Sequence, residues 1–374
     1  MKPAQASTAT ASPYAELIDQ VCQANLLSSS GSVLGWDLEV MMPSGGLEHR
    51  SKQLAQIASM VHEMKTSPRV GELLAACESD ASLRADPLSA EAVNLREIRR
   101  GYDRATKLPT SLVEELTRTS SMARIEWAKA RKASDFKQFK PWLEKIVKLL
   151  RDQAACYGWA EGGEVWDALA EDSEPGCTAA QVAAVFKPLR TRLVDLVGRL
   201  MASPNKPSNA FNEMKLPLAQ QEKFVRFVAE RIGFDFNRGR LDVSTHPFCS
   251  GSHAGDVRMT TRFHEDNVND ALGSTMHESG HAIYEQNLPA EAFGTPMGDS
   301  VSLGIHESQS RLWENQVGRS DAFWKWLHPK LSEYFGDAVS ELSRDEAFRR
   351  VDNVQPGLIR VEAAEATYNL HSMV

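Results

Sequence analysis

The chain has 374 residues, of which 42% are hydrophobic and 25% are charged, and its formal net charge is −8. This composition is ordinary for a globular protein that is long enough to bury a large core. No block of Lys and Arg resembles a nucleic-acid footprint, and no apolar run approaches the roughly 18 residues that span a bilayer. We therefore expect neither a nucleic acid nor a membrane as a partner.

The N-terminal segment and the cysteines indicate a compartment. Residues 1–13 contain one Lys and no apolar core, so they do not form a secretory signal, and we expect a disordered stub there. The five cysteines are scattered and show no CxxC spacing: Cys22, Cys77, Cys156, Cys177 and Cys249. An odd number of scattered cysteines favours a reduced, cytoplasmic protein over a disulfide framework.

Helical periodicity dominates the chain after the stub. Within 182–200 the apolar residues recur at steps of three and four, which places them on one face of a helix. Similar patterns predict helices at roughly 14–30, 46–66, 87–106, 109–133, 138–158, 217–232, 266–288, 301–318 and 320–350. The fold class is therefore mainly α, with a single domain expected over 14–374.

Only segment 233–265 has a different pattern. Apolar and polar residues alternate in 241–245 and in 257–263, and a cluster rich in Gly and Ser lies between these two runs. We predict a small antiparallel sheet that directly precedes the helix at 266–288.

A metal-binding pattern lies in that helix, at His277-Glu278-Ser279-Gly280-His281. Two histidines four residues apart lie on one helix face, so both imidazoles can reach one cation. Glu278 can reach a water beside that cation and take its proton. Gly280 costs about 1 kcal/mol in a helix, and its missing side chain would let another backbone approach. The plain alternative is two solvent-facing histidines beside a surface glutamate.

A catalytic zinc site of this type needs a third protein ligand and one open position. No third histidine follows at the short spacing of metzincins, so the next candidates lie in 304–314. Glu307 would complete a set of two His and one Glu, while His306 and Glu314 compete with it for this role. Arg311 shares a predicted helix face with the two glutamates and could orient or neutralise them.

Further segments along nearly the whole chain carry a family resemblance. They are Leu34–Glu39 with Met42, Pro43 and Gly45; Phe136–Pro141; Trp166–Leu169 with Glu174–Gly176; His246–Phe248; Asp256–Arg262; the HESGH helix; and His306–Gln309. In this order the segments resemble the motifs of the carboxypeptidase Taq family of metallocarboxypeptidases.

The resemblance implies a fold, a metal site and an activity. The fold would be a large helical metallopeptidase with two lobes around a deep groove and the metal at its floor. Glu307 would be the third ligand beside His277 and His281, and each chain would hold one divalent ion, zinc or else cobalt. The enzyme would be a homodimer that releases single residues from peptides with a free C-terminus.

A carboxypeptidase must also hold the free α-carboxylate of its substrate. The planar fork of Arg binds a carboxylate bidentately, and the candidates are Arg258, Arg262 and Arg360. Arg360 is similar to the arginine of the family's IRxxAD motif. Each of the three could instead form only a structural salt bridge.

Other polar side chains are candidates for contact with the substrate. His246 could donate a hydrogen bond to a tetrahedral oxyanion or could form only a structural hydrogen bond near Pro247. Tyr368 and Gln309 are further candidates for substrate binding, and Gln309 could instead lie behind the metal ligands.

Two departures from the family pattern leave other functions open. Ala364 stands where the family has the Asp of IRxxAD, and the family's C-terminal segment with GxxQDxHW has no counterpart here. We therefore expect weaker turnover than in longer relatives, because the site would be more open to water. The alternatives are an oligopeptidase or endopeptidase with the same metal site, and a non-catalytic relative that only binds metal or peptide.

Overall fold

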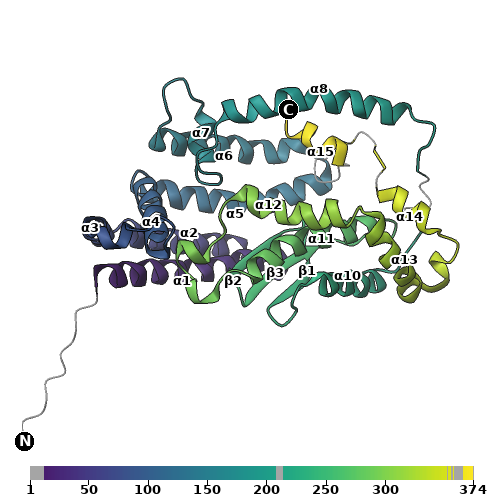
Figure 1. Cartoon of the computed structure of the whole chain (residues 1–374), viewed down its shortest axis with the longest axis horizontal. Helices are drawn as coiled ribbons and strands as arrows, with labels where there is room; N and C mark the ends of the chain where they lie inside the picture. The colour runs from purple at the N-terminus through teal and green to yellow at the C-terminus, as the bar shows by residue number, and fades with distance from the viewer. Residues whose placement is uncertain (1–11, 208–213, 352, 355–356, 358–364, 374) are drawn as a thin grey trace, which may run out of the picture. The chain divides into compact units, whose positions relative to one another are not determined.

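The computed structural model of the protein describes residues 12–207, 214–351, 353–354, 357 and 365–373. It confirms a mainly helical fold with one small sheet (Figure 1). The chain divides into two compact units, Met1–Tyr157 with Pro289–Asp299 and Gly158–Leu288 with Ser300–Val374. The single domain predicted over 14–374 stays a prediction, as does a groove between two lobes.

The first unit is built from long helices that begin at recognisable caps. Its α-helices are α1 (Pro13–Val40), α2 (Leu47–Lys65), α3 (Pro68–Ser79), α4 (Ala90–Ala105), α5 (Thr110–Ala133) and α6 (Phe136–Tyr157). Short 3₁₀ turns are η1 (Ser44–Gly46), η2 (Ala81–Arg84), η3 (Ala290–Ala292) and η4 (Pro296–Gly298). The side chains of Ser12, Ser67 and Ser89 accept hydrogen bonds from backbone N–H groups in the first turns of α1, α3 and α4. Residues 1–11 of the predicted stub lie outside the described residues.

Helix α3 is one element that the periodicity did not reveal. It supplies Val70, Leu73 and Leu74 to a core cluster that also contains Leu17 of α1 and Leu95 of α4. Ser67 followed by Pro68 is a helix-start pattern, since Ser caps the N-terminus and Pro fits the first turn. That start pattern would have placed the helix.

The second unit combines helices with the sheet. Its elements are α7 (Val165–Ala170), α8 (Ala179–Ala202), α10 (Leu218–Ile232), β1 (Gly239–Val243), β2 (Cys249–His253), β3 (Asp256–Thr261), α11 (Val268–Gln286), α12 (Leu303–Arg311), the π-helical segment η5 (Leu312–Val317), α13 (Asp321–Phe335), the 3₁₀ turn η6 (Gly336–Val339), α14 (Arg344–Val351) and α15 (Glu365–His371). None of the helices described here is both long enough and apolar enough to cross a membrane.

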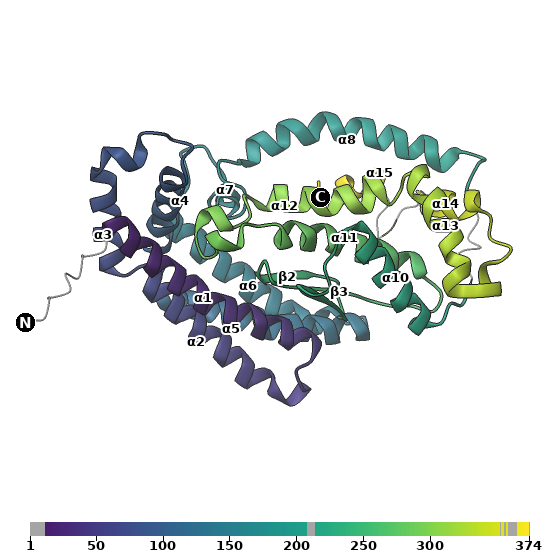
Figure 2. The ribbon, with the colours of Figure 1, turned by 60° about the horizontal axis from the view of Figure 1, so that its bottom comes forward.

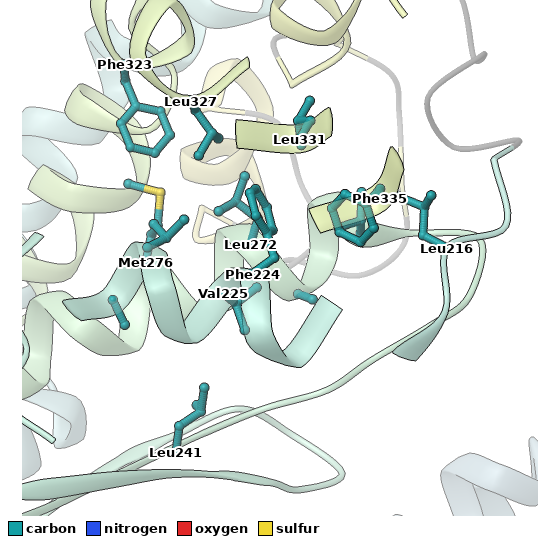
Figure 3. Packing of buried hydrophobic residues seen from close by; sticks show 14 of the residues in the cluster. Leu216, Phe224, Val225, Leu241, Leu272, Met276, Phe323, Leu327, Leu331 and Phe335 are labelled. Atoms are coloured by element: carbon teal, nitrogen blue, oxygen red, sulfur yellow. The ribbon is translucent and has the colours of Figure 1, made fainter. Parts of the chain in front are cut away.

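The core of this unit lies between α10, α11 and α13. Phe224, Met276, Leu327 and Leu331 are at most 1% exposed and belong to one cluster (Figure 3). Met276 is in the same helix as the predicted metal ligands. The apolar stripe of α11 therefore fixes which face of this helix turns away from the core.

The predicted sheet exists, but the prediction that it is antiparallel was wrong for one strand pair. The strand order is β1-β3-β2, in which β2 pairs antiparallel and β1 pairs parallel with β3. The reason is that β3 inserts between β1 and β2 instead of continuing a meander. The inserted strand is the most buried one: Val257, Met259, Thr260 and Thr261 are each 0% exposed. Helix α11 packs against this central strand (Figure 2).

Two long predicted helices are interrupted. The helix predicted at 320–350 consists of α13 and α14, with a break at Gly336, where φ is +58°. The helix predicted at 301–318 begins as α12 and continues as the π-helical segment η5, where the N–H of Gly318 donates to the carbonyl of Trp313. The π-helical segment changes which side chains of 312–317 face the metal-binding residues of α11.

Helices α11 and α12 approach each other closely at Gly280, as its missing side chain suggested. A Cβ atom on Gly280 would lie 2.4 Å from the carbonyl oxygen of Gln309 and 2.5 Å from the Cα of Ser310. Both are backbone atoms of α12, so no side chain could rotate to make room. Glycine is thus required here for the distance between the two helices.

We predict opposite effects of the same substitution at two glycines of α11. Gly280→Ala should lower the free energy of unfolding by about 1–3 kcal/mol, because the added methyl group forces the helices apart. Gly273→Ala, with no atom within 4 Å of its added Cβ, should raise the free energy of unfolding by about 0.5–1 kcal/mol. Urea unfolding measures both, and a Gly280→Ala variant as stable as Gly273→Ala would contradict the close approach.

Candidate metal centre

The structure brings the three predicted ligands together. His277 and His281 lie one turn apart on α11, and Glu307 reaches them from α12. Their donor atoms all lie within 4.8 Å of one another. The Oε2 atom of Glu307 is 3.7 Å from Nε2 of His277 and 3.4 Å from Nε2 of His281. Two donors that share one zinc ion at its usual bond lengths lie roughly 3.3 Å apart. The donor set therefore fits a divalent ion.

The two competing ligand candidates occupy the opposite sides of the imidazole rings. Glu314 Oε2 lies 2.8 Å from Nδ1 of His277. His306 Nδ1 lies 2.5 Å from Nδ1 of His281, and its Nε2 lies 2.7 Å from Oε1 of Glu285. Both candidates thus contact the Nδ1 atoms of the rings, and the Nε2 atoms face Glu307. Such contacts fix the orientation and the tautomer of a ligating histidine.

The carboxylates of this centre differ in their readiness to ionise. Burial raises the pKa of Glu278 to about 7, and the nearby charges of Glu307 and Glu314 add to this rise. Burial also opposes ionisation of Glu307, but the hydrogen bond with His281 and the charge of His277 outweigh it and hold the pKa at about 2. These surroundings therefore favour the ionised form of Glu307, as a cation ligand requires, and disfavour the ionised form of Glu278.

Glu314 owes its position to the π-helical segment and to Arg319. The wider turn of η5 changes the direction in which Glu314 leaves the helix compared with an α-helix. Arg319 donates to the backbone carbonyl of Val351 at 2.8 Å, and its other terminal nitrogen is 3.7 Å from Glu314. Arg311, which was expected to orient the glutamates, instead pairs with Glu365 and covers the ring of Tyr368, although its charge contributes to the lowered pKa of Glu314.

A cleft of about 780 Å³ within the second unit contains the centre. Among the predicted substrate-binding residues, His246, Arg262 and Tyr368 line it, and the Tyr368 hydroxyl donates to Oε1 of Glu307 at 3.4 Å. This volume is in the range of small-molecule and short-peptide sites.

The other predicted substrate-binding residues are placed differently. Arg258 forms two hydrogen bonds of 2.8 Å with Asp256, and neither Arg258 nor Gln309 is among the described residues that line the cleft. The Gln309 amide donates to Ser308 at 3.2 Å. Arg360 lies outside the described residues, so its predicted role stays a prediction.

Sequence reasoning also missed residues at or near the metal centre. Glu285 lies four residues after His281, so the helical spacing could have placed it on the same face. Arg319 and Arg350 line the cleft, but no local pattern connects them with the metal-binding helix.

Comparisons with known proteins match nearly the whole chain. The model of the carboxypeptidase Taq (M32) metallopeptidase family matches residues 16–374. This chain belongs to the carboxypeptidase Taq family. It is 40% identical to thermostable carboxypeptidase 1 of Thermus thermophilus over 368 residues, which cover 96% of this chain and 72% of that protein.

Solved structures of the carboxypeptidase Taq family have the same fold. The crystal structure of BsuCP superposes with a TM-score of 0.92 at 32% identity, covering 97% of this chain and 72% of that one. The M32 carboxypeptidase of Deinococcus radiodurans gives a TM-score of 0.84 at 36% identity, covering 96% and 71%. As a member of this family the chain is a metallocarboxypeptidase, which is a peptide hydrolase that uses a divalent ion.

We predict that Glu314→Gln weakens metal binding although Glu314 is no ligand. The amide accepts a weaker hydrogen bond from His277 than the carboxylate does, so the metal affinity should fall roughly 10- to 100-fold. Competition with a chromophoric chelator measures this change. The control is Glu333→Gln on α13, whose side chain is 56% exposed and pairs with Lys330. Equal metal affinities of the two variants would refute the role of Glu314 in orienting His277.

Proposed function

We propose that the enzyme releases single C-terminal residues from peptides, with Glu278 as the general base. The observation that carries this proposal is the buried Glu278, which is 6% exposed and lines the cleft beside the histidines of the His277, His281 and Glu307 set. A base with a pKa of about 7 is well matched to proton transfer near neutral pH.

One divalent ion per chain, zinc or else cobalt, would be held by His277, His281 and Glu307. Two imidazoles and one carboxylate form the donor set of many catalytic zinc sites. An ion of this kind supplies Lewis acidity, which polarises the scissile carbonyl and lowers the pKa of water.

The protein side chains would move the proton and hold the substrate. Glu278 takes a proton from the attacking water and passes it to the nitrogen of the leaving residue, so the carboxylate is restored after each cycle. His246 lines the cleft and would donate to the carbonyl oxygen as negative charge develops on it. The Tyr368 hydroxyl, which contacts Glu307, would bind the substrate nearby, and Gln309 would support Glu307 from α12.

Anchoring of the terminal carboxylate was predicted for Arg258, Arg262 and Arg360. In the described part of the chain, Arg262 already forms bonds of 2.6 and 2.8 Å with Asp270, and Arg258 is bound to Asp256. Each of these two would need to exchange its partner to bind substrate. The proposal for Arg360 rests on the family motif alone.

Homodimerisation and a cytoplasmic location are proposals that rest on the family resemblance and on the cysteines. All five cysteines are free thiols, as expected for a reducing compartment. Light scattering of the purified protein tests the dimer.

Two substitutions separate loss of the metal from loss of the base. His281→Ala should release most of the bound ion, because one of three ligands is removed. Glu278→Gln should keep the ion and lower the rate of hydrolysis by roughly 10²- to 10⁴-fold, because only the base is removed. Elemental analysis together with peptide hydrolysis measures both effects, with Glu333→Gln as the control. Unchanged metal content in His281→Ala would disprove the ligand set.

Substrates that differ only at the C-terminus distinguish the proposed activity from its rivals. We expect the zinc-loaded enzyme to cleave a short free-acid peptide and to release its last residue, while the C-terminal amide of the same peptide reacts far more slowly. Mass spectrometry of the products measures both reactions. Equal rates on the two peptides would identify an oligopeptidase or endopeptidase, and metal binding without any cleavage would identify a non-catalytic relative.

A further inference from the structure

The described residues that line the cleft include three arginines, and two of them are bound to acidic groups of the protein. Arg262 forms its two short hydrogen bonds with Asp270, and these side chains are only 13% and 15% exposed. Arg319 is held by the carbonyl of Val351 and lies beside Glu314. Both arginines therefore already have partners within the protein.

Arg350 is different because no group of the described chain pairs with it. Its Nε atom is buried and has no hydrogen-bond partner. Burial lowers the pKa of its guanidinium, and no charge of a described residue opposes this effect. A buried N–H group without a hydrogen-bond partner is costly, and Arg350 is otherwise only half-buried, so its terminal nitrogens remain open to a ligand.

The fold directs Arg350 inward. It is in the last turn of α14, three residues after Ala347, which is 0% exposed and packs into the core of the second unit. Residues three apart share a helix face, so Arg350 lies on the inner face and lines the cleft. Its neighbour Arg349 is exposed and donates to the carbonyl of Asn205 at 3.2 Å.

We propose that Arg350 binds the terminal carboxylate of the peptide substrate. A guanidinium presents parallel N–H groups that match the two oxygens of a carboxylate, and the ligand would supply the negative charge that no described residue supplies to Arg350. The cleft thereby has anionic groups at the metal centre and, at the end of α14, the cation of Arg350, which has no ion pair with a described residue. This inference rests on the proposed function, since it assigns the anchor that an exopeptidase needs.

The test measures binding in a protein that cannot turn over. In the zinc-loaded Glu278→Gln protein, calorimetry gives the Kd of a short free-acid peptide and of its C-terminal amide, with and without Arg350→Ala. We expect Arg350→Ala to weaken binding of the acid by roughly 10- to 100-fold, as for a lost charged hydrogen bond, and to leave binding of the amide unchanged. Arg349→Ala is the matched control and should change neither Kd.

Arg350→Lys covers the case in which the alanine variant does not fold. It keeps the charge but loses the planar fork, so it should retain the preference for the acid at reduced affinity. Guanidinium ion added to Arg350→Ala should restore part of the acid binding. An unchanged ratio of the acid and amide Kd values in the Arg350 variants would overturn the inference, while wild-type hydrolysis of acid and amide at equal rates would overturn the proposed function alone.

Discussion

The metal centre depends on one close contact between two helix backbones. Glu307 shares a space of ionic size with His277 and His281 because α12 lies against α11 at Gly280, where even a methyl group would not fit. Metal–ligand distances in a well-formed site stay within about 0.2 Å of their usual values. The packing of these two helices is therefore part of the coordination chemistry, although Gly280 itself contributes no donor atom.

The same contact places several carboxylates in a small volume, and their surroundings give them different properties. Glu307 faces two imidazoles, which stabilise its ionised form in spite of burial. Glu278 is buried near other carboxylates, so its ionised form is disfavoured. Environments that separate the pKa values of neighbouring carboxyl groups assign them to different tasks. The surroundings favour the anionic form of Glu307 and the protonated form of Glu278.

The spacing of residues along the chain predicted much of this structure, but it could not predict how distant segments pack against one another. The helical phase of His277 and His281 and the backbone contact at Gly280 follow from residues within one turn of α11. The strand order does not, because insertion of β3 between β1 and β2 involves residues that alternate equally well in either order. The choice between Glu307 and its competitors needed the direction in which α12 crosses α11. Arg350 had no local pattern at all, since its distinction is a buried Nε atom that no described group pairs with.

Because of the π-helical segment, side chains before it and side chains after it leave the helix in directions that are not related by 3.6 residues per turn. An α-helix turns by a fixed angle per residue, so a ligand and a supporting residue two turns later would always rotate together. Segment η5 contains a wider turn between Glu307 and Glu314. The carboxylate of Glu314 therefore points toward Nδ1 of His277 while Glu307 stays near Nε2. A helical wheel drawn with 3.6 residues per turn over the whole of 303–317 therefore gives Glu314 the wrong direction around the helix axis. With the wider turn, Glu307 lies near Nε2 of His277 and Glu314 contacts Nδ1 of the same ring.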